Sequence, residues 1–370
     1  MRQKDQMEQN DHDTDPGLNR PISLDEIRFF VRKLKNRKAT GLDRIPNEVL
    51  KNNNVMVILH NLFDKFFMSG FLPSVWLRAI INPIPKSASK DPHIPLNYRG
   101  ISILSCVGKV FSGIINTRVV KYCEENNVFE DEQNGFRKNR SCEDHIFVLT
   151  SIIRNRLTMG KDTFCAFVDM QKAFDWVDRD LLFYKLLKYN IRGNIYKCIK
   201  ALYSHPLARV KVNNNVTEWF EINSGVRQGD SLSPSLFGLF INDLISEIKD
   251  LNIGIKIKDE LVSILAFADD NMILVDNEED LQKMLKHVEL WCAKWRLKVN
   301  TDKTNIVHFR KKNTRITRFN FYFDGIVLNI VDRYKYLGTM LQEHLDMLHQ
   351  QFCPLQQEGH LEQLFLNSRF

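Results

Sequence analysis

The sequence predicts an α+β fold, because helical and strand patterns occur together but do not alternate regularly. Apolar residues recur at helical spacing in several long stretches, as Ile146 and Leu149 do within 142–159. Short apolar runs between turn-forming residues predict strands, for example at 164–168 and 264–268. A regular succession of βαβ units would have favoured a parallel α/β sheet, and the sequence lacks one.

The first 160 residues predict mainly helices. Residues 1–20 are polar and poor in apolar side chains, so we expect a disordered tail. Ser23 followed by Glu26 is typical of a capping box, which predicts a helix through about Asn36. Further helices are predicted at 46–68, 107–125 and 142–159, and the Pro-interrupted stretch 71–105 predicts strands.

The second part of the sequence predicts strands and helices in mixed order, without an internal repeat. We expect helices near 179–189, 193–203, 234–249 and 278–296. Strands are predicted at 164–168, 208–212, 216–222, 264–268, 272–275, 305–309, 319–323 and 326–330.

Composition narrows the class of protein without deciding it. A length of 370 residues suggests two to three domains, and a net charge of +7 suits a protein that neutralises phosphates. The 7 Cys residues are scattered, which argues against a zinc site and against a disulfide framework. We therefore expect reduced thiols in an intracellular protein. No apolar run of about 18 residues occurs, so we expect no membrane contact.

The most informative motif is the adjacent pair Asp269 and Asp270 between two apolar runs. Such flanks predict two strands joined by a turn, which holds both carboxylates close together. Like charges at that distance are costly unless a cation neutralises them, and oxygen ligands of this kind suit Mg²⁺. Asp is also a common turn residue, so a purely structural interpretation stays open.

A third carboxylate, Asp169, ends the predicted strand at 164–168. An acid at a strand end that faces an acidic hairpin is what a two-metal phosphoryl-transfer site requires. The residues alone also permit Asp169 as a helix cap or turn residue. For the nearby Asp175 we prefer a solvated or locally capping carboxylate.

Several blocks of the sequence resemble, in order, the reverse transcriptases of non-LTR (LINE-type) retrotransposons. The palm blocks are FVDMQKAFDWVD (167–178), SGVRQGDSLSPSLFGLFINDL (224–244), LAFADDNMIL (265–274), WRLKVNTDKTNIVHF (295–309) and YKYLGTML (334–341). The fingers blocks are KATGLDRIPNEVLK (38–51), NYRGISILS (97–105) and NGFRKNRSCEDHI (134–146). The resemblance covers most of the chain, from about residue 23 to residue 341.

The resemblance implies a right-hand polymerase fold with fingers and palm, in which helices back an antiparallel palm sheet. It implies a reverse transcriptase domain over about 75–341 and a thumb that is largely absent. The implied divisions are a tail at 1–20, fingers with a helical N-terminal extension at 21–160, a palm with the primer grip at 161–341, and a remnant tail at 342–370.

By resemblance, Asp169, Asp269 and Asp270 are the catalytic carboxylates and bind two Mg²⁺ ions, with Mn²⁺ as a possible substitute. Lys303 resembles the general acid that protonates the departing pyrophosphate. Phe174 resembles the bulky residue under the incoming sugar, where a ring would exclude a 2′-hydroxyl. A core aromatic is an equally good interpretation of Phe174 from composition.

The remaining implied contacts involve phosphates and nucleic acid. Lys86 and Arg99 would bind the β and γ phosphates, and Gln228 and Gly229 would contact the nucleotide. Arg137 and Lys138 would contact the template backbone. The residues that would hold the primer end are Tyr336, Leu337 and Gly338.

The resemblance implies an RNA-directed DNA polymerase, a nucleotidyltransferase whose partners are an RNA template, a DNA primer and dNTPs. One rival is a catalytically impaired remnant that only binds nucleic acid. Another is a cyclase-like or DNA-templated palm enzyme, since a palm with paired acids serves several reactions. The block at 227–229 argues against a cyclase. A nuclear location suits the family, and the oligomeric state stays open.

Overall fold

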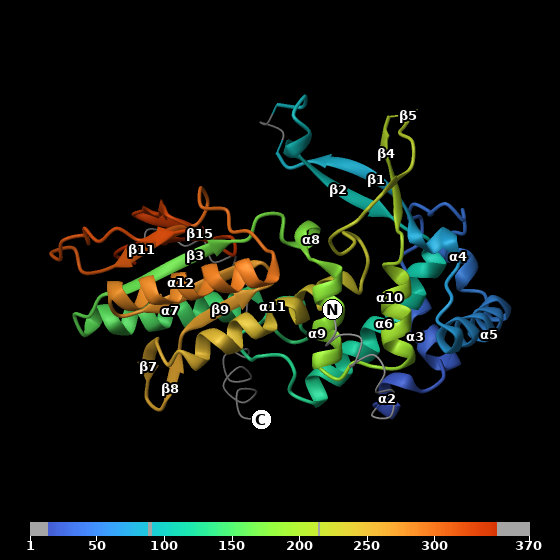
Figure 1. Cartoon of the computed structure of the whole chain (residues 1–370), viewed down its shortest axis with the longest axis horizontal. Helices are drawn as coiled ribbons and strands as arrows, with labels where there is room; N and C mark the ends of the chain where they lie inside the picture. The colour runs from blue at the N-terminus through green and yellow to red at the C-terminus, as the bar shows by residue number, and fades with distance from the viewer. Residues whose placement is uncertain (1–13, 88–90, 214, 346–370) are drawn as a thin grey trace.

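The computed structural model of the chain describes residues 14–87, 91–213 and 215–345 (Figure 1). Most of the predicted remnant tail, 346–370, lies outside the described residues, as does 1–13 of the predicted disordered tail. The prediction of disorder is wrong for the end of that tail. Helix α2 (Pro16–Asn19) is capped by Asp15, and Leu18 is only 1% exposed. The buried leucine and hydrogen bonds from Asn19 to Arg192 and from Arg118 to Arg20 therefore fix this polar segment to the body of the protein.

The helices of the N-terminal part follow the predicted order. Helix α3 (Leu24–Lys33) begins at the predicted capping box, in which Ser23 and Glu26 satisfy each other's backbone N–H groups. The predicted single helix at 46–68 is instead two, α4 (Asn47–Leu50) and α5 (Asn53–Ser69). The side chain of Asn52 caps α5 and so restarts the helix.

Two longer helices complete this part of the chain. Helix α6 (Cys106–Glu125) is buried along most of its length and packs against α3 and α2. Helix α7 (Cys142–Thr158) starts at a second capping box, formed by Ser141 and Asp144. Both helices agree closely with the prediction from apolar spacing.

The predicted fingers strands form one sheet, called the fingers sheet here. Strand β1 (Arg78–Pro85) pairs antiparallel with β2 (Tyr98–Ile103). Strand β1 also pairs in parallel with β4 (Leu207–Val212), which comes from much later in the chain. Two short strands, β5 (Asn215–Val216) and β6 (Phe220–Glu221), pair with β4. Figure 1 shows this sheet projecting away from the helices.

The second large sheet, called the palm sheet here, has the strand order β14-β11-β3-β10-β9. Its central strand β3 pairs antiparallel with β10 and with β11, and β10 pairs antiparallel with β9. The bounds are β3 (Thr163–Asp169), β9 (Ile264–Phe267), β10 (Asp270–Val275), β11 (Asn305–Phe309) and β14 (Asn329–Ile330).

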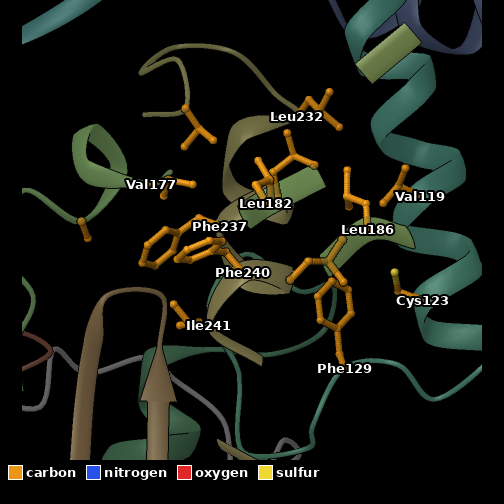
Figure 2. Close-up of a cluster of buried hydrophobic side chains, with 14 of the residues drawn as sticks. Val119, Cys123, Phe129, Val177, Leu182, Leu186, Leu232, Phe237, Phe240 and Ile241 are labelled. Carbon is orange, nitrogen blue, oxygen red and sulfur yellow. The ribbon is translucent and has the colours of Figure 1, made fainter. Parts of the chain in front are cut away.

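Alternation along β3 divides the core between the two faces of the palm sheet. Phe164, Ala166 and Val168 belong to the larger buried cluster, whereas Cys165 and Phe167 belong to a second cluster. Figure 2 shows part of the larger cluster, with Phe237 and Phe240 among side chains from several helices. The helices whose side chains contribute to that cluster include α9 (Arg179–Lys188), α10 (Asn194–Leu202), α11 (Ser233–Asp250) and α12 (Glu278–Trp295).

The opposite face of the palm sheet is covered by α7 and by a hairpin of β15 (Arg333–Tyr336) and β16 (Thr339–Gln342). The short elements are α8 (Ala173–Trp176), β12 (Tyr322–Phe323), β13 (Ile326–Val327), and the 3₁₀ turns η1 (Ser74–Leu77) and η2 (Pro95–Asn97).

Two hairpins were not predicted as strands, namely β7 (Ile255–Ile257) with β8 (Glu260–Val262), and β15 with β16. The charged turn residues and short strands of β7 and β8 give a weak strand pattern in the sequence. The mixture of helices and largely antiparallel sheets otherwise confirms the predicted α+β class. Within the described residues, no helix is long and apolar enough to cross a membrane.

Candidate active site

The structure brings Asp169 and Asp270 together. Asp169 is the last residue of β3, Asp270 is the first of β10, and the two are directly opposite in the antiparallel pair. Residues opposite each other have side chains on the same face, with Cβ atoms about 4.5–5.5 Å apart. Asp269 precedes Asp270 in the turn from β9. The strand register therefore brings two of the three predicted acids together, and the third is their neighbour in the turn.

The electrostatic environment of these acids favours the binding of a cation. Burial and the charges of Asp269 and Asp169 raise the pKa of Asp270 to about 6. Burial also raises the pKa of Asp169 and that of Asp269. A cation bound nearby would stabilise the ionised form of these three carboxylates, because it compensates their negative charge.

Lys303 forms an ion pair with one of these acids. Its Nζ lies 3.8 Å from Asp169 Oδ2, and 67% of its side chain is exposed. Its charge lowers the pKa of Asp169 against the larger effect of burial. Lys303 is thus close enough to the acids to reach a group bound beside them.

The loop before β11 fixes the end of β3. The backbone N–H of Asp169 donates to Thr304 Oγ1 at 3.1 Å, and Asn300 N donates to the carbonyl of Asp169 at 2.8 Å. Thr304 is fully buried. These contacts were not predicted, because they join segments more than a hundred residues apart in sequence.

Phe174 lies between the core and the surface. Its ring stacks on Phe237 with centroids 4.8 Å apart and meets the edge of Phe136 at 6.3 Å. The side chain is half-buried. The ring thus packs on α11 on one side, in agreement with the core interpretation, whereas the contact with an incoming sugar stays a prediction.

The segment 224–229 packs against α8 and the fingers sheet. Gly225 has a φ of +82°, and a Cβ there would lie 2.7 Å from the carbonyl oxygen of Asp175. Gly229 has a φ of +104°, and a Cβ there would lie 2.8 Å from the carbonyl oxygen of Ser102. Only glycine fits both positions, so the segment is held close to both neighbours.

Asp175 is exposed, as predicted, and also contacts the 224–229 segment. Gln228 Nε2 donates to Asp175 Oδ1 at 2.8 Å, so this exposed carboxylate orients the glutamine that the resemblance places at the nucleotide. The solvated interpretation of Asp175 therefore agrees with its exposure, and the hydrogen bond from Gln228 is an additional contact that was not predicted.

Arg227 is a functional neighbour that sequence reasoning missed. Its guanidinium is buried and donates to the carbonyl oxygens of Trp76 at 2.8 Å and Leu202 at 2.6 Å. Arg227 thereby connects η1, which directly precedes β1 of the fingers sheet, to the end of helix α10. An arginine in a polar loop gives no sequence signal that distinguishes this role from surface exposure.

Lys86 and Arg99 lie at the same end of the fingers sheet, as predicted for neighbouring strands. Arg99 on β2 is opposite Ile84, and Lys86 N donates to the carbonyl of Asn97 at 2.8 Å. Both side chains are exposed. The charge of Arg99 also lowers the pKa of Asp269 against the larger effect of burial, which places its cation within electrostatic reach of the acids.

Arg137 does not face a template. Its side chain is 8% exposed and pairs with Glu124 at 2.6 Å. Its Nη1 donates to the carbonyl oxygens of Glu130 and Gln133. The expectation of a template contact is therefore wrong for Arg137, because its donors are occupied within the protein. The neighbouring Lys138 is exposed.

The three predicted primer-grip residues differ in exposure. The ring of Tyr336 is 3% exposed and packs against Phe167, and burial raises the pKa of its hydroxyl. Leu337 and Gly338 form the turn of the β15–β16 hairpin with positive φ angles of 44° and 86°. Tyr336 therefore supports the hairpin from beneath, whereas Leu337 and Gly338 lie at its turn.

The donor set has the chemistry of a divalent-cation site but does not form a complete cage. Across residues 14–87, 91–213 and 215–345, no group of three or more His, Cys, Asp or Glu side chains is already spaced to hold a metal ion. Mg²⁺ commonly takes only one or two carboxylates and completes its shell with water and substrate phosphates. The opposed acids and their raised pKa values fit that mode of binding.

Comparison with known proteins decides the family. Residues 84–341 match the family described as "Reverse transcriptase (RNA-dependent DNA polymerase)". The chain belongs to this family. The match includes all three acids, the 224–229 segment and the β15–β16 hairpin, so the predicted family is confirmed.

Curated relatives of the chain come from mobile elements. A probable RNA-directed DNA polymerase from transposon BS of Drosophila melanogaster is 29% identical over 88% of the chain, which covers 36% of that relative. The RNA-directed DNA polymerase from mobile element jockey of the same species is 25% identical over 88% of the chain and 35% of the relative. The chain spans about a third of the length of these relatives.

Among solved structures, apo telomerase from Candida tropicalis, truncated from its C-terminal domain, is similar in fold. The TM-score is 0.50 at 12% identity, covering 77% of this chain and 59% of the telomerase chain. At that identity the likeness concerns the fold alone, and it agrees with the predicted α+β arrangement of fingers and palm.

Proposed function

We propose that the chain is the RNA-directed DNA polymerase of a non-LTR retrotransposon. It joins the 3′ hydroxyl of a DNA primer to the α-phosphorus of a dNTP on an RNA template and releases pyrophosphate. The observation that carries this proposal is the register that sets Asp270 opposite Asp169, beside Asp269 in the turn. Work on chromosomal DNA would place the protein in the nucleus.

Asp169, Asp269 and Asp270 hold the Mg²⁺ ions, for which Mn²⁺ can substitute. When bound, the two ions activate the attacking hydroxyl and stabilise the leaving pyrophosphate. The raised pKa values support this assignment, because a bound cation would offset the cost of burying the ionised carboxylates close together.

The phosphates and their proton are handled by basic residues around the acids. Lys303 Nζ supplies a proton to the leaving pyrophosphate, a role supported by its exposed position 3.8 Å from Asp169. Lys86 and Arg99 bind the β and γ phosphates from the fingers sheet. Arg99 can engage two phosphate oxygens at once, because guanidinium donors form a planar fork.

Phe174, Gln228 and Gly229 bind the sugar and base of the nucleotide. The exposed part of the Phe174 ring excludes a 2′-hydroxyl, and Gln228 is oriented by Asp175. Gly229 lets the backbone approach closely where any Cβ would meet Ser102.

Lys138 contacts the template backbone, and the hairpin turn at Leu337 and Gly338 supports the primer end. Tyr336 acts indirectly, since its ring is buried beneath that turn. Its neighbour Tyr334 stacks on Phe167 with centroids 4.3 Å apart, which ties the hairpin to the strand that ends in Asp169.

Primer extension tests this function. The chain is incubated with poly(rA)/oligo(dT), labelled dTTP and Mg²⁺, beside an Asp269→Asn variant of equal folded content. We expect incorporation by the wild type alone. Equal incorporation by both proteins would exclude these acids as the catalytic centre. Tight binding of the primer–template without incorporation would instead favour a nucleic-acid-binding remnant.

A further inference from the structure

A short loop before α7 lies along the edge of the palm sheet, and residues 132–135 of this loop are called the strap here. Strand β9 is the outermost strand of the sheet on that side. The strap pairs with it, because Ala266 N donates to the carbonyl of Glu132 at 2.9 Å and Asn134 N donates to the carbonyl of Ala266 at 2.9 Å. The edge strand that leads into the acidic turn is thus covered.

The side chain of Gln133 reaches from the strap into that turn. Its Oε1 accepts hydrogen bonds from Ala268 N at 2.9 Å and from Gly135 N at 2.8 Å, and the residue is 1% exposed. Ala268 has a φ of 57°, in the left-handed region that non-glycine residues rarely adopt. The hydrogen bond to Gln133, a residue outside the turn, therefore holds Ala268 in its left-handed conformation.

Gly135 makes this contact possible. A Cβ built on Gly135 would lie 2.2 Å from the backbone nitrogen of Ala268, so no other residue fits without a shift of the backbone. The strap and the turn therefore touch through their main chains as well as through Gln133.

The strap is itself anchored to two helices. Arg137 donates to the carbonyl of Gln133 at 3.1 Å and pairs with Glu124 of α6 at 2.6 Å. Lys249 of α11 pairs with Glu132 at 3.0 Å. A chain of contacts therefore runs from the helices through Gln133 to Ala268, the residue directly before Asp269.

We propose that Gln133 is a positioning residue for the acidic turn. Its Oε1 fixes the left-handed conformation of Ala268, which sets the direction in which Asp269 and Asp270 leave the turn. This inference rests on the proposed polymerase function, and Gln133 acts through Ala268 rather than by touching substrate. A misplacement of about 1 Å at a catalytic group can cost about 100-fold in rate.

The test compares Gln133→Met with a matched control, Gln282→Met. Gln282 makes a similar clamp elsewhere, because its amide accepts from Tyr322 N at 2.7 Å and donates to Tyr322 O at 2.9 Å, joining α12 to β12. Both changes remove a side-chain amide from a backbone clamp at similar volume. The readouts are kcat, the KM for dTTP, and hydrogen exchange of the Ala268 amide without added metal.

We expect Gln133→Met to lower kcat by about 10-fold to 100-fold, with the KM for dTTP changed little. The Ala268 amide should exchange faster by a similar factor, while Gln282→Met leaves both values as in the wild type. Gly135→Ala should act in the same direction as Gln133→Met.

Two results would overturn the proposal. One is a kcat for Gln133→Met equal to that of Gln282→Met in an active wild-type background. The other is an Ala268 amide that exchanges in the wild type as fast as an open turn amide, a measurement that applies even when the variants fail to fold. An inactive wild type would contradict the polymerase function, whereas the exchange data would still test the clamp.

Discussion

Asp270 lies directly opposite Asp169 in the β3–β10 pair, so the register of these two strands brings acids from distant segments to one face of the palm sheet. The hydrophobic pattern enforces this register. Met272 and Leu274 lie on the same face as Asp270 and are buried with Cys165 and Phe167. A slip by one residue would move that whole set to the other face, so packing fixes the carboxylates.

The first prediction concerns the stability of the metal-free protein. The pKa of Asp270 in the folded state, about 6, lies above the ordinary 3.8. The native state therefore binds more protons than the unfolded state between these values, and stability falls as the pH rises through that window. At pH 8 the full repulsion is present, so Asp270→Asn should raise the melting temperature of the metal-free protein.

Differential scanning calorimetry with EDTA at pH 8 and at pH 4 measures this effect. The gain from Asp270→Asn should be larger at pH 8, and added Mg²⁺ should stabilise the wild type more than the variant. A variant that melts below the wild type at pH 8 would show that Asp270 is held by favourable contacts rather than by packing alone.

The second prediction concerns sugar selection. Phe174→Ala removes the ring that packs on Phe237, and should raise the kcat/KM for rUTP relative to dTTP by at least about tenfold. Single-nucleotide extension on poly(rA)/oligo(dT) gives this ratio. Phe147→Ala, on the exposed side of α7, serves as the control and should leave the ratio unchanged. An unaltered ratio in Phe174→Ala would assign the ring to the core alone.

The third prediction separates two adjacent basic residues. Lys138→Ala should lower the slope of log K against log salt for primer–template binding by about one, as the loss of a phosphate contact does. Arg137→Ala should leave the slope unchanged and lower the melting temperature, because its guanidinium pairs with Glu124 inside the protein. Salt-dependent fluorescence anisotropy measures both slopes. A lower slope for Arg137→Ala together with an unchanged slope for Lys138→Ala would contradict this assignment and support a template contact by Arg137.

The fourth prediction uses a buried lysine behind the palm sheet. Lys185 pairs with Asp243 and lies over the rings of Trp291 and Trp295, and burial lowers its pKa to about 7. The native state loses this proton near pH 7, whereas the unfolded chain keeps it until about 10.5. Because the unfolded state binds more protons than the native state between those pH values, this group makes the free energy of unfolding rise with pH there.

Urea unfolding of wild type and Lys185→Met at several pH values measures that contribution. The stability of the wild type relative to the variant should increase from pH 7 to pH 9.5. A difference that is independent of pH would mean that Lys185 remains charged in the folded protein.

Local sequence signals predicted a large part of the fold. The capping boxes at Ser23 and Ser141 set the starts of α3 and α7, and apolar runs located β3 and β10. These signals depend on neighbours within a few residues, so one sequence is enough to detect them. The acids Asp169, Asp269 and Asp270 were found because each follows or interrupts such a run.

The missing parts depend on contacts between distant segments. Gln133, Arg227 and Thr304 form hydrogen bonds with backbone atoms far away in sequence, and their local sequence does not show which atoms these are. Arg137 was assigned to the template because its block resembles a fingers motif, yet its partner Glu124 belongs to the preceding helix. Side-chain type alone does not distinguish a buried clamp from an exposed phosphate contact.

The most direct test of the central claim is an equilibrium titration with Mn²⁺, followed by the electron paramagnetic resonance signal of the free ion. If Asp169 and the turn acids form one cation site, Asp169→Asn and Asp269→Asn should each abolish the Mn²⁺ binding that the wild type shows, and primer extension should be lost with it. Undiminished Mn²⁺ binding by either variant would contradict a site shared between β3 and the β9–β10 turn.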